Sequence, residues 1–270
     1  MTTIEGRIAV VTGGASGIGR GIAEELGAQG ATVIIADVER GALERTATEI
    51  GAVGIHVDVS DPQSVESLAE QVTERFGSVG ILVNNAGVGP LARVADMTTA
   101  DWRFLIDINL WGVINGVTAF LPRLLANPDG GHIVNTGSMA SFAPMAGGGG
   151  YAVTKYGVAA VTEALALELE EDAADVHVTL LAPGTVHTNI KNSLRNRPAG
   201  LEGGLADVDI SQERAADLRW MEPRDVGKIV ARAIRNNDLY ALTHPDWWGI
   251  VEARHAAIRD AFHAYPAELP

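Results

Sequence analysis

The chain has 270 residues, a formal net charge of −14 at pH 7 and no cysteine. Its acidic balance argues against nucleic acid or an anionic membrane surface as a partner. Without cysteine, disulfides, thiolate catalysis and zinc–thiolate sites are excluded, and we expect no metal site.

The first half of the chain alternates apolar, β-branched runs with segments of helical periodicity. The apolar runs predict buried strands at residues 7–12, 32–36, 54–57 and 81–85. The segments between them predict helices at residues 18–29, 39–50 and 62–76. Gly30 ends the first helix, and Pro62 begins the third at a position that favours proline.

The second half repeats the alternation with longer helices. Helices are predicted at residues 99–125, from Tyr151 to about Leu169, and at 223–235, with strands at 132–138, 176–181 and 239–243. Residues 189–220 are polar and contain glycine, which predicts a mobile lid. The tail at 246–264 has a helical pattern, with two tryptophans at its start.

Strands that are apolar on both faces and alternate with helices predict an α/β fold. We expect a Rossmann-type, doubly wound parallel sheet of about seven strands with helices on both faces. No linker or change of composition divides the chain, so residues 1–270 are expected to form one domain. No apolar run approaches the length of a membrane span, and the early first strand leaves no room for a signal peptide. A soluble, cytoplasmic protein is therefore expected.

A glycine-rich turn, Thr12–Gly19, joins the first strand to the first helix. Glycines permit close backbone approach, and a helix N-terminus offers unpaired N–H groups to a pyrophosphate. Asp37 ends the second strand, where a carboxylate binds both ribose hydroxyls and repels a 2′-phosphate. This pattern favours NAD over NADP, although Arg40 could soften the discrimination and Asp37 could instead cap the following helix.

Tyr151 and Lys155 lie one turn apart on the helix predicted from Tyr151 to about Leu169. A nearby ammonium favours phenolate, so Lys155 is expected to lower the pKa of Tyr151. Ser138, at the end of a strand, could donate a hydrogen bond to a carbonyl or alkoxide oxygen. Taken alone, a tyrosine and a lysine at this spacing are more often a solvated surface pair.

From about Arg7 to Leu242, the chain resembles the short-chain dehydrogenase/reductase family in its compact, single-domain form. The motifs that carry the resemblance are T-G-x-x-x-G-x-G at Thr12–Gly19, N-N-A-G at Asn84–Gly87, an asparagine at Asn109, a serine at Ser138, Y-x-x-x-K at Tyr151 and Lys155, and P-G-x-V-x-T at Pro183–Thr188. Their shared order and spacing are specific to this family.

The resemblance implies a role for each matched position. It implies that Asn109, Ser138, Tyr151 and Lys155 are catalytic, and that Asn109 holds a water that links Lys155 to solvent. An asparagine that stabilises a helix bend fits the same position, and the two roles are compatible. The implied NAD-binding residues are Gly13, Ser16, Gly17, Ile18, Gly19, Asp37, Asp58, Val59, Asn85, Ala86, Gly87, Tyr151, Lys155, Pro183, Gly184, Val186 and Thr188.

The predicted substrate pocket is apolar, with walls at residues 88–91, 139–145 and 189–220. Such walls favour a bulky, hydrophobic secondary alcohol or ketone, although the same residues could simply be core. We expect an NAD-dependent alcohol dehydrogenase or carbonyl reductase that acts on this small molecule. An NADP-preferring biosynthetic ketoreductase and a non-catalytic nucleotide-binding protein are the alternatives.

The helices at about 99–125 and 152–170 carry apolar residues on more of their circumference than one sheet face can cover. These residues are Leu105, Ile108, Leu110, Trp111, Val113 and Ile114 on the first helix and Val158, Val161, Leu165, Leu167 and Leu169 on the second. We therefore expect a homo-oligomer, with a tetramer favoured and a dimer possible. The tryptophan-containing tail could serve this interface or the pocket.

Overall fold

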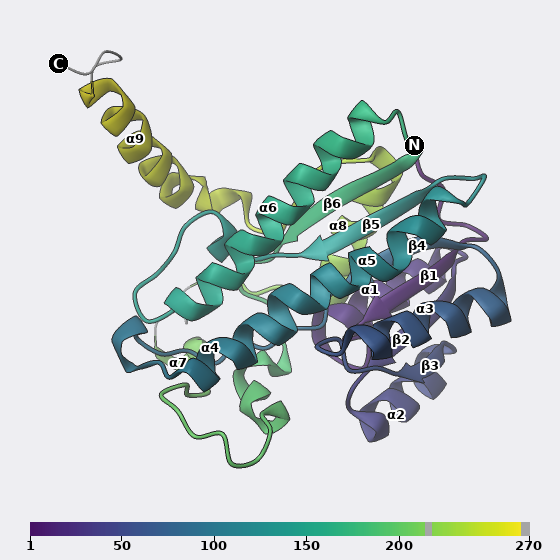
Figure 1. The fold of residues 1–270 in the computed structure, drawn as a ribbon, viewed down its shortest axis with the longest axis horizontal. Coiled ribbons are helices and arrows are strands. Elements are labelled where there is room, and N and C mark those ends of the chain that lie inside the picture. Colours follow the sequence, from purple (N-terminus) through teal and green to yellow (C-terminus); the bar gives the residue numbers. More distant parts are fainter. Residues whose placement is uncertain (214–217, 266–270) are drawn as a thin grey trace.

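A parallel sheet runs through the centre of the computed structural model, which describes residues 1–213 and 218–265 (Figure 1). Within these ranges, seven strands form one sheet in the order β3-β2-β1-β4-β5-β6-β7. The strands are β1 (Ile8–Thr12), β2 (Thr32–Asp37), β3 (Val53–His56), β4 (Val79–Asn84), β5 (Gly131–Thr136), β6 (Val176–Ala182) and β7 (Tyr240–Leu242). All of their pairings are parallel, as the two-sided apolar runs predicted.

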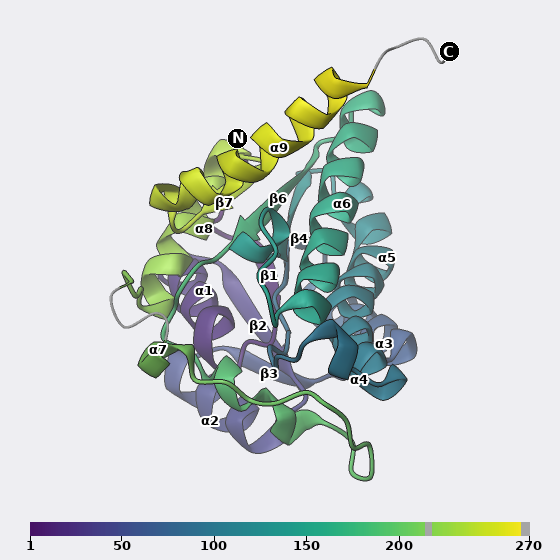
Figure 2. The same ribbon diagram turned by 90° about the vertical axis from the view of Figure 1, so that its left-hand side faces the viewer.

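Helices cover both faces of the sheet. The α-helices are α1 (Gly17–Ala28), α2 (Arg40–Ile50), α3 (Pro62–Phe76), α4 (Thr99–Ile106), α5 (Gly112–Leu125), α6 (Gly149–Glu171), α7 (Ile210–Glu213), α8 (Pro223–Asn236) and α9 (Trp248–Ala264). In Figure 2, α1, α2 and α8 lie on one side of the sheet and α3, α5 and α6 on the other. Each layer buries its own apolar cluster against the strands. The predicted Rossmann-type, doubly wound fold is confirmed.

The strand order reverses beside β1, whose neighbours are β2 and β4. In open parallel sheets, ligands bind outside the carboxyl ends of the strands at such a reversal. The predicted nucleotide residues after β1, β2 and β4 therefore lie at one edge of the sheet.

The predicted helix at 99–125 is continuous but contains a turn of π-helix at Asp107–Trp111. Residues 99–125 are apolar and long enough to cross a membrane by length and composition, so the expectation that no run approaches this length was wrong. Half of its most apolar window is nevertheless buried inside the protein. The hydrophobicity of this helix thus matches a core helix that packs on the sheet and on α6.

Helix α6, which carries Tyr151 and Lys155, begins earlier than predicted, at Gly149. The glycines just before Tyr151 have a packing role. A Cβ atom on Gly149 would lie 2.5 Å from Val94 Cγ2, and one on Gly150 would lie 2.6 Å from Met97 Cε. These glycines allow the first turn of α6 to contact the segment that precedes α4.

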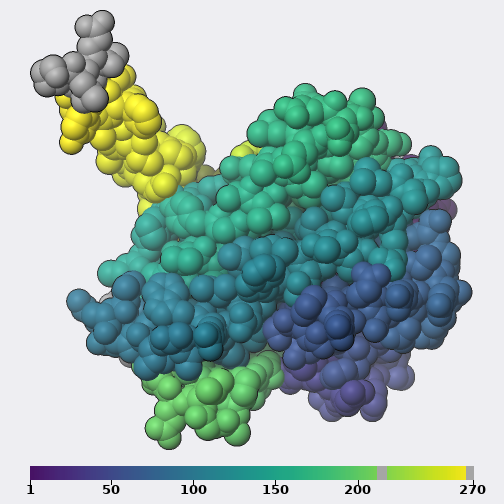
Figure 3. Space-filling view, in the orientation of Figure 1, coloured from purple at the N-terminus to yellow at the C-terminus, as the bar shows by residue number. Residues whose placement is uncertain are grey.

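Helix α9 projects from the body of the molecule, as the space-filling view shows (Figure 3). Its first turns contact the body, where Val251 is buried. Farther along, Phe262 is 79% exposed. The predicted helical tail is therefore present, and its two ends have different surroundings.

Candidate active site

Three side chains of the predicted catalytic set meet at the carboxyl ends of β5 and β6. Tyr151 and Lys155 lie on α6, and the Lys155 Nζ atom is 5.5 Å from the centre of the Tyr151 ring. The Ser138 side chain, just after β5, forms a hydrogen bond with the Tyr151 side chain. The spacing of four residues therefore brings tyrosine and lysine together, as predicted, and the strand end adds serine.

The local backbone fixes these three residues. Ser138 caps a short 3-10 turn, Met139–Ser141, and its Oγ accepts a hydrogen bond from the Ala140 N–H at 3.1 Å. The Ser141 Oγ donates to the Lys155 carbonyl at 2.7 Å. This contact ties the serine turn to the catalytic helix.

Burial dominates the protonation of the pair. It raises the pKa of Tyr151 above its ordinary value, and the hydrogen bond from Ser138 only partly opposes it. Burial also lowers the pKa of Lys155 from 10.5 to about 8. In the protein by itself the pKa of Tyr151 is therefore raised and not lowered as expected, because desolvation disfavours the charged form.

Asn109 lies in the π turn and is fully buried. Its amide accepts from the Val88 N–H at 2.8 Å and donates to the Val88 carbonyl at 2.9 Å, which holds the segment after β4. A Cβ atom on Gly87 would lie 3.2 Å from Asn109 Oδ1 and 3.8 Å from Lys155 Nζ, so glycine keeps the space between these groups open. Asn109 thus ties the π turn to the segment after β4, and both its bend role and the water link stay predictions.

The glycine-rich turn and the segment after β4 contact each other closely. Gly13 has a φ of +64°, and a Cβ atom there would lie 2.7 Å from Ala86 Cα. The Thr12 hydroxyl accepts from the N–H groups of Asn85 and Ala86 at 2.9 and 3.2 Å. Any residue larger than glycine at position 13 would separate the two walls.

Asp37 is held by backbone donors at the end of β2. Its Oδ2 accepts from the Ala15 N–H at 3.1 Å, and its Oδ1 accepts from the Glu39 N–H at 3.0 Å. Burial raises the pKa of Asp37, and these hydrogen bonds oppose it. Asp58 caps its own turn by accepting from the Ser60 N–H at 3.0 Å.

A cleft of about 1910 Å³ connects the catalytic and glycine-rich ends of this region. It is lined by all of the predicted site residues except Gly19 and Asn109. Gly19 instead permits close packing, since a Cβ atom there would lie 2.2 Å from the Gly13 carbonyl oxygen. Asn109 acts from behind the wall of the cleft.

The apolar half of the cleft combines predicted and unpredicted residues. Val88, Met139 and Met145 come from predicted walls, whereas Trp247 and Ile250 come from the tail. Val251, also in the lining, packs against Met139 and Ala182. The start of the tail therefore serves the pocket, a role that the sequence pattern left open.

The described part of the predicted lid is fixed at several points; residues 214–217 lie outside the described ranges. It contains a 3-10 segment at Asn189–Asn196, and Leu91 and Ala206 exchange backbone hydrogen bonds at 2.9 and 3.0 Å. Beyond this segment, the Arg197 guanidinium lies 2.7 Å from Asp101. Asp101 is fully buried; its desolvation is outweighed by hydrogen bonds from Thr98, Gly204 and Arg197, so its pKa falls to about 2.

Glu39 is a site residue that the sequence pattern did not identify, and it forms an ion pair with Arg195. The Arg195 guanidinium contacts Glu39 across the cleft at 2.6 Å. Arg40, the cation expected near Asp37, lines neither this cleft nor the small polar cavity beside it, whereas Arg195 lines both. The only sequence signal was an acidic residue two positions after Asp37.

Comparison with known proteins identifies the class that this fold and site define. The family model for short chain dehydrogenases matches residues 7–199. The chain therefore belongs to the short-chain dehydrogenase/reductase family of oxidoreductases.

Individual relatives agree with this membership. The chain is 31% identical to the C alpha-dehydrogenase of Sphingobium sp. (strain NBRC 103272 / SYK-6), over 97% of its own length and 88% of that protein. A short chain dehydrogenase/reductase from Burkholderia phymatum, solved in complex with NAD, is 34% identical, with a TM-score of 0.89 over 100% of this chain and 99% of that one. The probable oxidoreductase EphD of Mycobacterium bovis is 40% identical over 83% of the chain, but the chain spans only 39% of its length.

Proposed function

We propose that the protein is an NAD(H)-dependent oxidoreductase that interconverts a bulky, hydrophobic secondary alcohol and the corresponding ketone in the cytoplasm. The observation that carries the proposal is one cleft that holds Ser138, Tyr151 and Lys155 at one end and Asp37 at the other. Ser138, Tyr151 and Lys155 would handle a proton on the substrate oxygen, and Asp37 would select a cofactor with free ribose hydroxyls. The NAD-bound relative from Burkholderia phymatum supports the choice of cofactor.

The described residues fit a dinucleotide. The glycine contacts described above bring the backbone close to the cleft. The Ser16 side chain makes no capping hydrogen bond to the N-terminus of α1. The free N–H groups of that helix suit a pyrophosphate. Thr188 packs against Gly17: a Cβ atom on Gly17 would lie 3.1 Å from the Thr188 methyl group. When bound, NAD supplies a hydride acceptor, and NADH supplies a hydride donor.

The protein's own residues handle the proton. As a phenolate, Tyr151 would take a proton from the substrate hydroxyl during oxidation, and as a neutral tyrosine it would return that proton to the oxygen during reduction. Ser138 would donate a hydrogen bond to the same oxygen. Lys155, whose Nζ donates to the Thr136 carbonyl at 2.9 Å, is held beneath the tyrosine ring, where its charge would stabilise a phenolate.

The wall of the cleft supports a hydrophobic substrate. Met139, Met145, Trp247 and Ile250 offer apolar surface beside the catalytic residues, and such surface favours aliphatic or aryl groups. A panel of secondary alcohols with NAD, followed by the absorbance of NADH, tests the proposal. We expect turnover to increase with the size of the apolar group. No turnover of any alcohol or ketone with either NAD or NADP would contradict an enzymatic role.

Cofactor choice depends on Asp37. We expect the wild type to use NAD more efficiently than NADP, because the carboxylate binds ribose hydroxyls and repels a 2′-phosphate. Asp37→Ala should lower kcat/KM with NAD and raise it with NADP. The ratio of the two kcat/KM values measures the effect, and a wild-type preference for NADP would support the biosynthetic ketoreductase instead.

We also propose a homo-oligomer, although fewer of the apolar helix residues are exposed than the sequence suggested. Leu105, Val113 and Val158, which were assigned to an interface, are covered within the chain, whereas Trp111 and Leu167 are 50% and 62% exposed. We expect light scattering to give a tetramer, and Trp111→Glu to give smaller species, because a carboxylate would be buried at the interface. A fully active monomer of the wild type at micromolar concentration would refute this proposal.

A further inference from the structure

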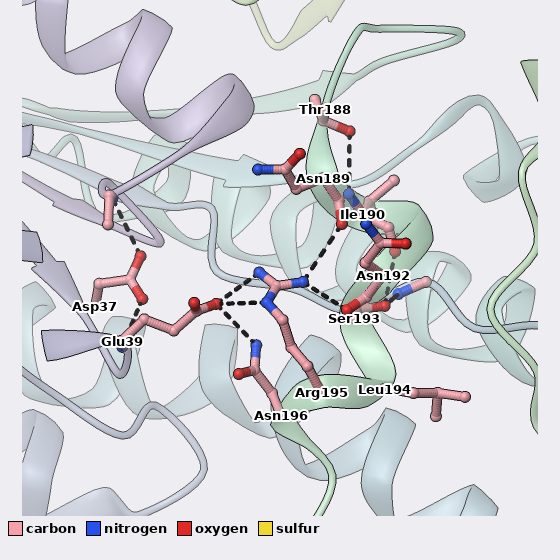
Figure 4. A network of polar contacts seen from close by, with 12 residues as sticks. Asp37, Glu39, Thr188, Asn189, Ile190, Asn192, Ser193, Leu194, Arg195 and Asn196 are labelled. Carbon is pink, nitrogen blue, oxygen red and sulfur yellow. Dashed lines mark hydrogen bonds and ion pairs between the residues drawn. The ribbon is translucent and has the colours of Figure 1, made fainter. Parts of the chain in front are cut away.

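An arginine of the lid reaches across the cleft to the turn after β2. The Arg195 Nη2 and Nε atoms donate to Glu39 Oε1 at 2.6 and 3.1 Å, and Asn196 Nδ2 donates to the same oxygen at 3.3 Å (Figure 4). Arg195 Nη1 also donates to the Asn192 carbonyl at 2.6 Å, which orients the guanidinium. Because Glu39 and Arg195 are 156 positions apart in sequence, their contact joins two separate walls of the cleft.

Glu39 lies at the end of the cleft where Asp37 would bind the adenosine ribose, here called the adenosine end, because the Glu39 N–H donates to the Asp37 carboxylate. Glu39, Asp37 and Arg195 line both the main cleft and a polar cavity of about 270 Å³ beside it. Ser16 and Arg45 also line the small cavity. The ion pair therefore borders the space into which a substituent on the ribose would extend.

Two ion pairs hold the same stretch of the lid, and their burial differs. The side chains of Arg197 and Asp101 are 9% and 0% exposed, whereas those of Arg195 and Glu39 are 40% and 34% exposed. An exposed pair opens at little cost, but separating a buried pair leaves an uncompensated charge. The lid thus has a firm attachment at Arg197 and a releasable one at Arg195.

We propose that Glu39 and Arg195 form a cofactor latch, an ion pair that closes the adenosine end of the cleft, slows dinucleotide release and keeps Arg195 from binding a 2′-phosphate. The proposal rests on the NAD-dependent function proposed above. In this proposal Glu39 is a second determinant of cofactor choice. Glu39 acts by keeping Arg195 in an ion pair, whereas Asp37 acts directly on the ribose.

The test measures release of NADH by stopped-flow fluorescence at low and high salt. The variants are Glu39→Gln, Arg195→Gln and the double variant. Glu49→Gln is the control, because Glu49 also forms a surface ion pair, with Arg20 at 2.8 Å, but lies outside the cleft. We expect each latch variant to release NADH roughly two- to fivefold faster, as the loss of an exposed ion pair implies. The double variant should be no faster than the faster single variant, and Glu49→Gln should match the wild type.

Salt and NADPH provide two further readouts. High salt should accelerate release from the wild type more than from the latch variants, because it screens the pair. Glu39→Gln should tighten NADPH binding by freeing Arg195, and Arg195→Gln should not. Equal tightening in both variants would overturn the role in selection. Release rates unchanged in both single variants would overturn the latch alone, whereas a wild type that binds no NADH would overturn the latch and the proposed function together.

Discussion

Tyr151→Phe is expected to reduce kcat by about 10²- to 10⁴-fold, the usual contribution of general acid–base catalysis. The substitution removes one hydroxyl that is hydrogen-bonded to Ser138, and leaves the ring beside Lys155. Cofactor binding should stay within about twofold of the wild type, because only the proton donor is removed and the aromatic ring stays in place. Steady-state kinetics and an NADH fluorescence titration measure the two quantities separately.

Tyr156→Phe is the matched control for this experiment. Tyr156 is the next tyrosine on α6, and its buried hydroxyl has no hydrogen-bond partner among the described residues. Its ring lies under the Arg254 guanidinium, outside the cleft. We expect this variant to keep wild-type turnover. Substantial activity in Tyr151→Phe would show that another group transfers the proton.

Lys155→Met is expected to abolish efficient turnover and to change how stability depends on pH. Burial lowers the pKa of Lys155 to about 8 in the folded protein, from an ordinary value of 10.5. One pKa unit is equivalent to about 1.36 kcal/mol, so the buried ammonium costs roughly 3 kcal/mol below pH 8. Between pH 8 and 10.5 the unfolded chain binds more protons at this group, so its contribution to the free energy of unfolding rises with pH.

The measurement is the free energy of unfolding of wild type and variant, from denaturant titrations between pH 7 and 10.5. The difference, wild type minus Lys155→Met, should rise by roughly 3 kcal/mol across the upper part of this range. Lys228→Met is the control, because Lys228 is 60% exposed and pairs with Asp225 on the surface. A difference that does not change with pH would mean that Lys155 is not desolvated in the folded protein.

Much of the fold and of the candidate site was predictable because it depends on local patterns. Two-sided apolar runs identify strands such as β4, and the spacing of Tyr151 and Lys155 places them on one helix face. Asp37 was predictable in the same way, since it directly follows an apolar run. These features need only neighbouring residues and the geometry of regular structure.

The rest depends on tertiary contacts that leave no local pattern. Glu39 with Arg195, and Asp101 with Arg197, are pairs distant in sequence and without periodicity. The packing of Val251 against Met139 likewise follows from where the tail returns to the sheet. The pKa of Tyr151 was misjudged because sequence shows which charges are near but not how deeply a hydroxyl is buried.

The π turn at Asp107–Trp111 separates two halves of one helix, and the two halves contact different parts of the protein. The first half carries Asp101, which holds the lid, and the second half packs against the sheet. Each residue of an α-helix advances the side chain by about 100° around the axis. The length of the π turn therefore sets the rotation of one half of the helix relative to the other. Deleting one residue from it would rotate Asp101 about the helix axis by roughly 100° relative to the half that packs on the sheet. Variation in the length of this turn is a route by which related chains could reorient their lids while keeping the same core.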